Sequence, residues 1–90
     1  MNQEINVILH HCCQKFSVSI DEVCSNSTKM EVVYCRKAFA RIVKERFTVS
    51  NKTIGAFINK KYNSVYYMIH YDTIDTKFDR VLAEIKNELQ

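Results

Sequence analysis

Apolar residues recur three and four positions apart along most of this chain, which is the spacing of one face of an α-helix. Residues 2–16 predict an amphipathic helix with apolar positions at Ile5, Ile8, Leu9, Cys12, Cys13 and Phe16. The longest helix is expected to start at Ser27 or Thr28 and to run to about Phe47. Its apolar arc consists of Val32, Cys35, Ala38, Phe39, Ile42 and Val43. This length and this arc predict the central helix of the core.

Polar residues interrupt the apolar spacing and predict where the first helices end. Residues 17–19 break the first helix. Ser19 followed by Glu22 has the spacing of a capping box, which predicts a short helix ending near Cys24. The polar cluster 25–28 then separates this short helix from the long one, because its side chains compete for backbone hydrogen bonds.

A C-terminal helix is predicted after a kink or break between Thr73 and Thr76, where Asp75 can cap its first turn. Its apolar residues are Phe78, Val81, Leu82, Ile85 and Leu89. This spacing is compatible with a helix that closes the bundle and with one that extends beyond it. We therefore describe residues 1–90 as a single domain in which 76–90 form a C-terminal helical extension.

Residues 50–71 predict two helices joined by a tight basic turn. Ser50 or Asn51 can cap the first of them, and Gly55 is small enough for a second helix to approach closely. The apolar residues of the first helix are Ile54, Phe57 and Ile58, and those of the second are Val65, Met68 and Ile69. Both sets have helical spacing.

Asn59 is expected to end the first of these two helices, because asparagine tolerates the left-handed backbone conformation. Residues 59–61 would then form the turn, and residues 62–64 the first turn of the next helix. This arrangement is typical of a helix-turn-helix DNA reader, in which the N-terminal turn of the second helix meets base edges.

Composition favours an all-α fold. The chain has 90 residues, with one glycine, no proline and 47% hydrophobic residues. Ninety residues suit one domain, and the scarcity of turn residues suits a helical bundle better than a sandwich or barrel. No apolar run approaches the length of a transmembrane helix or a secretory signal. We expect a soluble, cytoplasmic protein that contacts no membrane.

The cysteines and histidines do not form a recognisable site. Four thiols without a CxxC pair are expected to stay reduced and to pack as small core hydrophobes, at Cys12, Cys13, Cys24 and Cys35. The run from His10 to Cys13 contains zinc-ligand types, but four consecutive helical residues point around the whole circumference. The three histidines accompany no recognisable nucleophile and orienting carboxylate. We expect no metal, no cofactor and no catalysis.

Positive charge is the remaining chemical signal. A net charge of +3 is compatible with a polyanionic partner without requiring one. Four cations of the long helix return to one flank at spacings of seven and eight: Lys29, Arg36, Lys37 and Lys44. A solvated basic face is the simpler interpretation. The absence of Asp and Glu from the matching positions of that flank favours contact with phosphates.

These features together resemble the C-terminal DNA-binding domain of DnaA, the bacterial replication initiator, over about residues 3–78. Its parts stand here in the family's order: Phe16-Ser17-Val18-Ser19, Tyr34-Cys35-Arg36-Lys37-Ala38, Ile54-Gly55 and the run from Asn59 to Val65. The resemblance implies an all-helical, Trp-repressor-like bundle. It also implies that the second motif helix enters the major groove while cations of the long helix contact the DNA backbone or minor groove.

The chain departs from that family in the stretch that reads DNA. Lys61 and Tyr62 stand where the family has an Asp-His pair, so charge and donor geometry both differ and the family's target sequence is not implied. The 90 residues also contain no Walker A motif. An initiator's ATPase activity is therefore not expected.

The leading hypothesis is double-stranded DNA binding in a replication-linked or regulatory role by a monomer. The expected base-reading residues are Tyr62, Asn63 and Ser64, and the expected backbone contacts are Lys29, Arg36, Lys37, Lys44, Lys60 and Lys61. Asn63 is the first candidate because its amide can bond N6 and N7 of adenine together. The alternative is that Asn63 and Ser64 only cap the helix.

The second hypothesis is a protein-interaction module that keeps this fold but has lost base-specific readout. It would use a surface that we call the tyrosine face, formed by Tyr62, Tyr66, Tyr67 and Tyr71. The cations along the long helix and the turn favour DNA, because a protein partner gives no general reason to hold them together.

Overall fold

The computed structural model describes residues 2–71 and 75–89, and these form helices without any strand. The helices are α1 (Asn2–Phe16), α2 (Ile20–Val23), α3 (Met30–Arg46), α4 (Asn51–Ile58), α5 (Tyr62–His70) and α6 (Thr76–Glu88). The prediction of an all-α fold is confirmed. Within this described part, no helix has the length and apolarity needed to cross a membrane.

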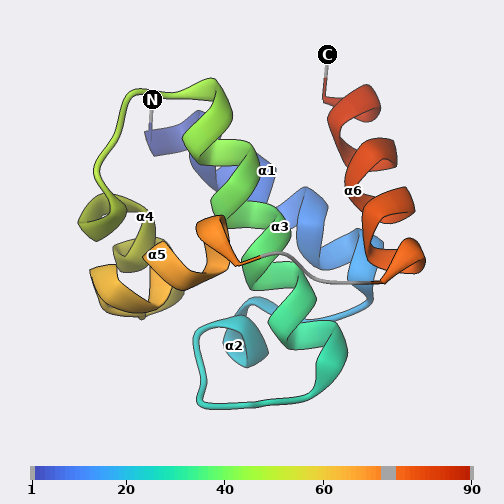
Figure 1. The fold of residues 1–90 in the computed structure, drawn as a ribbon, viewed down its shortest axis with the longest axis horizontal. Coiled ribbons are helices and arrows are strands. Elements are labelled where there is room, and N and C mark those ends of the chain that lie inside the picture. The colour runs from blue at the N-terminus through green and yellow to red at the C-terminus, as the bar shows by residue number, and fades with distance from the viewer. Residues whose placement is uncertain (1, 72–74, 90) are drawn as a thin grey trace.

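Helix α3 occupies the centre of the molecule, as its apolar arc predicted. Figure 1 shows α4 and α5 on one side of α3 and α6 on the other, with α1 behind and α2 below. Phe39, Ile42 and Val43 of α3 have no exposed surface, and they share one core with residues of the other five helices. Burial of this arc is the main source of stability for a domain of this size.

Local capping sets several helix ends where the sequence predicted them. Ser19 accepts a hydrogen bond from the backbone N–H of Glu22, whose carboxylate accepts one from the N–H of Ser19, so the capping box is formed. Ser17 adopts a left-handed conformation (φ 57°) at the end of α1. Asp75 caps α6 by accepting from the N–H groups of Lys77 and Phe78.

Helix α3 begins at Met30, later than the predicted start at Ser27 or Thr28. The preceding residues are held in a non-helical loop by their own side chains. The Ser25 hydroxyl donates to the carbonyl of Glu22 and accepts from the N–H of Ser27, and the Ser27 hydroxyl accepts from the N–H of Lys29. These bonds compete with a helical start, so Lys29 becomes the N-cap residue.

Helix α6 packs into the bundle. Its Phe78 and Ile85 are buried in the common core, with the Phe78 ring against Phe16 and Tyr34. The predicted break at Thr73 lies outside the described residues, while Thr76 is the first residue of α6. The arrangement in which the C-terminal helix closes the bundle is therefore the one observed.

The cysteines behave largely as predicted. Cys12, Cys13 and Cys35 are buried among apolar side chains, and Cys24 is half-buried. Burial raises the pKa of the Cys12 thiol to about 12, which keeps it protonated and unreactive at neutral pH.

Candidate nucleic-acid interface

Helices α4 and α5 form a compact unit around the three-residue turn 59–61. Ser50 caps α4 by accepting from the N–H of Thr53, and Asn59 ends α4 in the left-handed conformation (φ 56°, ψ 45°). A Cβ atom at Gly55 would collide with the carbonyl oxygen of Lys60 and lie 3.3 Å from Val65. Gly55 therefore mainly permits the backbone of the turn, at Lys60, to approach α4 closely, and the contact with α5 at Val65 is less tight.

The first two residues of the turn, Asn59 and Lys60, donate hydrogen bonds to the residues that follow α2. The Asn59 side-chain amide donates to the carbonyl of Cys24 (3.2 Å), and the Lys60 ammonium donates to the carbonyl of Ser25 (2.7 Å). Burial, and then the neighbouring Arg36 guanidinium, lower the pKa of Lys60. Lys60 thus positions the start of α5 while it contributes charge at that point.

Arg36 differs from its predicted role as a phosphate contact. Its side chain is 5% exposed, and its guanidinium donates to the carbonyls of Glu22, Val23, Ser25 and Ser27 at 2.7–3.2 Å. Four of its donors are therefore used inside the protein. Arg36 therefore holds the α2–α3 loop in place, and these bonds leave little of its guanidinium available for a phosphate.

The remaining cations predicted on the long helix do not form one patch. Lys29 is exposed at the N-terminal end of α3, whereas Lys44 lies near the C-terminal end and donates to the carbonyl of Val49 (3.0 Å). These two residues are separated by about 22 Å along the helix axis. Lys37 lies over the Phe78 ring of α6, 5.9 Å from its centroid. The predicted basic flank is thus divided between the two ends of α3 and the α6 side.

A concentration of lysines occurs instead between α4 and the start of α5. An open groove of about 430 Å³ is lined by Lys52, Ala56, Lys60, Lys61 and Tyr62. We call it the lysine groove. It brings the predicted residues Lys60, Lys61 and Tyr62 together with Lys52, which was not among the predicted contacts.

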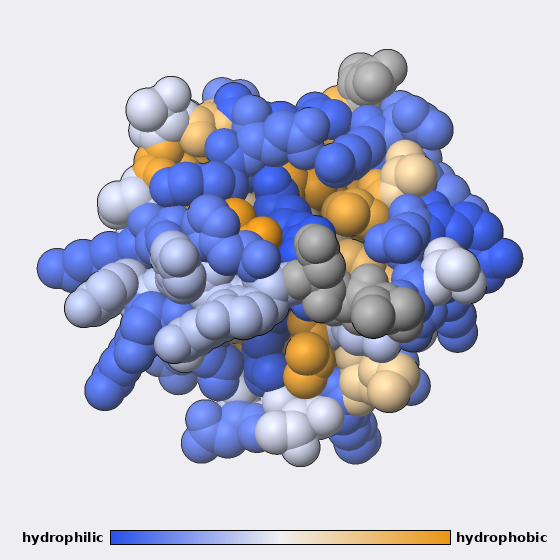
Figure 2. All heavy atoms as spheres, viewed as in Figure 1, coloured by the Kyte–Doolittle hydropathy of each residue, from blue (hydrophilic) through white to orange (hydrophobic). Residues whose placement is uncertain are grey.

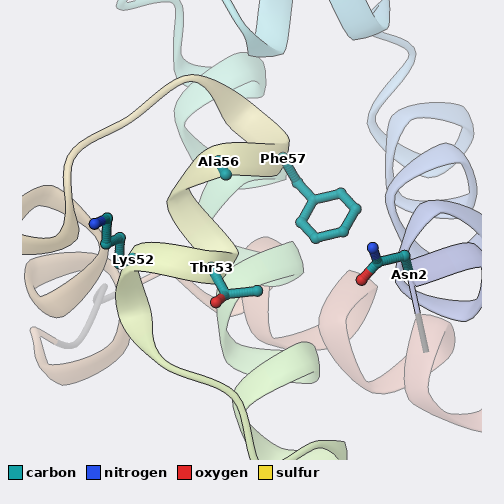
Figure 3. Close-up of a pocket in the computed structure, with 5 residues that line it drawn as sticks. All are labelled: Asn2, Lys52, Thr53, Ala56 and Phe57. Atoms are coloured by element: carbon teal, nitrogen blue, oxygen red, sulfur yellow. The ribbon is translucent and has the colours of Figure 1, made fainter.

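Lys52 also borders a second pocket, of about 390 Å³, on the side of α4 that faces α1. Figure 3 shows Phe57 and Asn2 facing each other across this pocket, with the Lys52 side chain on the other side of α4. The charged end of Lys52 is thus directed away from the apolar ring and toward the side of the lysine groove.

The first turn of α5 presents two of the three predicted base-reading residues to solvent. Tyr62 is 66% exposed and Asn63 is also exposed, but Ser64 is half-buried. The Asn63 side-chain oxygen accepts from the N–H of Ser64 (2.9 Å), while the N-cap residue, Lys61, makes no side-chain cap. Asn63 therefore satisfies one N–H group of the first turn through its oxygen, and its exposed side chain also carries an amide NH₂ that can donate.

Two further residues of α5 share this outward face. Tyr66 and Tyr67 follow Tyr62 and Asn63 by four positions, about one helical turn, so they lie on the same side of the helix. They are 49% and 55% exposed. The C-terminal end of α5 is held by Arg41, which donates to the carbonyls of Met68 and Tyr71. Helix α5 is consequently held at both ends, because the bond from Lys60 to the carbonyl of Ser25 holds its N-terminal end.

Residues 46–71 contain no Asp or Glu, although the whole chain has 10 acidic residues. The α4–α5 side of the molecule is mostly hydrophilic in Figure 2. Its lysines have no carboxylates of their own segment beside them, because that segment contains no Asp or Glu. Several acidic side chains elsewhere are used in structural ion pairs, such as Glu84 and Glu88 with Lys15. This carboxylate-free stretch is the sequence signal that would have identified Lys52.

No group of three or more His, Cys, Asp or Glu side chains within the described ranges is placed to hold a metal ion. No family model, curated protein or solved structure matches this chain.

Proposed function

We propose that this chain binds double-stranded DNA, with α4 and α5 acting as a helix-turn-helix of the Trp-repressor-like, DnaA-like type in a replication-linked or regulatory role. The observation that carries the proposal is the position of the lysine groove beside the exposed N-terminal turn of α5. In such motifs this turn meets base edges, while cations around it contact phosphates.

The proposed base-reading residues are Tyr62, Asn63, Tyr66 and Tyr67, and Ser64 is at the edge of this group. Asn63 can donate its amide N–H groups to base acceptors, while the tyrosines offer ring edges for thymine methyl groups and hydroxyls for hydrogen bonds. The proposed phosphate contacts are Lys29, Lys44, Lys52, Lys60 and Lys61. Lys44 lies at the end of α3 that leads toward α4, and Lys29 lies at the opposite end of α3.

The lysine groove can be tested by a charge-matched comparison of two double variants. Lys52→Gln with Lys61→Gln should weaken binding to every duplex by roughly tenfold or more, and should reduce the salt dependence by about one unit of slope per lysine. Lys77→Gln with Arg80→Gln removes the same charge from α6, on the other side of α3. Fluorescence anisotropy with random duplexes measures both, and equal effects of the two variants would contradict the proposal.

The exposed tyrosines support a second candidate function. Tyr62, Tyr66, Tyr67 and Tyr71 are all 49–66% exposed, and tyrosine is enriched at protein interfaces. A protein-interaction module would use this tyrosine face without base readout. It would show no measurable affinity for any duplex at low salt, which separates it from the leading proposal.

A further inference from the structure

The tyrosine face exposes more aromatic surface than duplex reading requires. The rings form a continuous series along α5 and its C-cap residue. The ring centroid of Tyr66 lies 5.8 Å from that of Tyr67 and 4.3 Å from that of His70, and the centroids of Tyr67 and Tyr71 are 5.0 Å apart. Four of the chain's five tyrosines are in this series or one turn before it, all exposed. Such clustering of rings in solvent is uncommon without a partner.

A DNA duplex offers these rings little to stack on. The faces of its bases are covered by their neighbours, so a reader in the major groove meets only base edges and methyl groups. An unpaired strand differs because its bases can turn outward and stack on aromatic side chains, which every base can do through its π face. The ring faces of α5 therefore match unpaired bases better than paired ones.

Charge indicates the class of partner for this surface. The tyrosine face adjoins the lysine groove through Tyr62, which belongs to both. The stretch 46–71 has no carboxylate to repel a phosphate backbone. Proteins that bind single strands combine a positive groove for the backbone with aromatic residues for the bases, and this chain places both on one unit.

We propose that α5 also binds single-stranded nucleic acid, with Tyr66 and Tyr67 stacking on unpaired bases and Lys52 and Lys61 contacting the strand's phosphates. This activity goes beyond duplex binding. It shares Lys52 and Lys61 with the proposed duplex contacts, but it takes bases on the ring faces, whereas the proposed duplex reading uses the amide of Asn63 and the ring edges.

The experiment compares ring removal with ring retention at the same two positions. Labelled oligothymidylate of about 12 nucleotides, and a duplex of equal length, are titrated with the full chain and with two double variants, and anisotropy is recorded. Tyr66→Leu with Tyr67→Leu should weaken single-strand binding by about tenfold or more. Tyr66→Phe with Tyr67→Phe keeps the rings and should bind the single strand within about twofold of the parent.

Intrinsic fluorescence provides a second readout. The chain has no tryptophan, so its emission comes from tyrosines, most of them on this face. Unlabelled oligothymidylate should quench this emission in the parent and in Lys52→Gln with Lys61→Gln at saturation, because stacking persists once the strand is bound.

Three results would overturn the inference: no single-strand binding, equal affinity of the Leu and Phe variants, or binding without quenching of tyrosine emission. A protein that binds the duplex but not the single strand loses only this inference. A protein that binds the single strand but not the duplex supports it and contradicts the proposed duplex function. Binding of neither indicates a protein partner for the tyrosine face and overturns both.

Discussion

Arg36 shows how a cation that was predicted to contact a ligand can instead be used to stabilise the fold. Its guanidinium donates to four backbone carbonyls of the α2–α3 loop, and burial lowers its pKa while leaving it charged at neutral pH. Lys60 donates to one of the same carbonyls, that of Ser25. The loop, the turn and the start of α5 are therefore positioned together.

Arg36→Lys should destabilise the protein although it preserves charge. A lysine carries one ammonium with three donors and cannot match the planar fork of arginine, so some buried carbonyls would lose their hydrogen-bond partners. The free energy of unfolding should fall by about 1–3 kcal/mol. Urea denaturation followed by circular dichroism measures the loss. Lys29→Gln, which removes a charge from the exposed end of α3, is the control and should change stability by less than about 0.5 kcal/mol.

Asn63 combines a local structural role with the proposed base reading, and Asn63→Asp separates the two. The aspartate keeps an oxygen for the N–H of Ser64 and is favourable near a helix N-terminus, so the melting temperature should be unchanged or slightly higher. It loses the amide donors and adds a negative charge at the proposed DNA surface. Duplex affinity should therefore fall by about tenfold or more. A variant that keeps its melting temperature and binds duplexes as before would show that Asn63 is only a cap.

At the scale of elements, α6 is held to the bundle by carboxylates at both of its ends. The Tyr34 hydroxyl donates to Asp75 at 2.8 Å and, with the N–H groups of Phe78 and Lys77, lowers the pKa of that carboxyl. At the other end, Lys15 at 3.0 Å and then His11 lower the pKa of Glu88.

These shifts predict acid sensitivity of the fold. A carboxyl with a lower pKa in the folded than in the unfolded chain contributes stability that is fully present above its unfolded pKa, about 4, and lost as pH falls through the folded value. The free energy of unfolding should therefore fall as pH decreases below about 5. Asp75→Asn with Glu88→Gln should be less stable at pH 7 and should show a flatter pH dependence, measured by urea denaturation.

The matched control for this pH dependence is Asp21→Asn with Glu31→Gln, which removes two carboxylates from α2 and α3. It should keep the slope of the parent protein. If both double variants lost the slope equally, the pH dependence would reflect net charge rather than the attachment of α6.

The elements were largely predictable because their signals are local. The capping box of Ser19 and Glu22, the cap at Ser50 and the left-handed Asn59 each depend on neighbours within a few residues, and each is confirmed. The delayed start of α3 was missed because Ser25 and Ser27 favour a loop.

The candidate site was less predictable because it depends on which distant segments meet. Helical spacing placed Arg36 and Lys37 on a basic flank, but α2 and α6 pack against that flank. Arg36 donates to the carbonyl of Val23 in α2, and Lys37 lies over the Phe78 ring of α6. Lys52 lies on no periodic flank with the other cations and becomes part of a groove only when α5 packs on α4. Such contacts over long sequence separations leave no local pattern.

At the scale of the whole molecule, charge is distributed asymmetrically about α3. On one side, α6 is joined to α1 and α3 by ion pairs, including Lys15 with Glu84 and Glu88, and Lys86 with Glu45. On the other side, the lysines of α4 and of the turn before α5, which are Lys52, Lys60 and Lys61, lie in a stretch without carboxylates. A net charge of only +3 thus includes a locally positive surface, which suits a polyanion approaching from the α4–α5 side.

The most direct test of duplex binding is the salt dependence of affinity for a random DNA duplex. Fluorescence anisotropy of the intact chain, measured between about 50 and 200 mM salt, should give a straight line of log affinity against log salt. At about 0.9 per neutralised phosphate, the slope should lie between about −1.8 for the two lysines tested by mutation and about −4.5 for all five proposed contacts. A slope near zero, or no measurable binding at about 50 mM salt, would contradict the proposal that this protein binds DNA through α4 and α5.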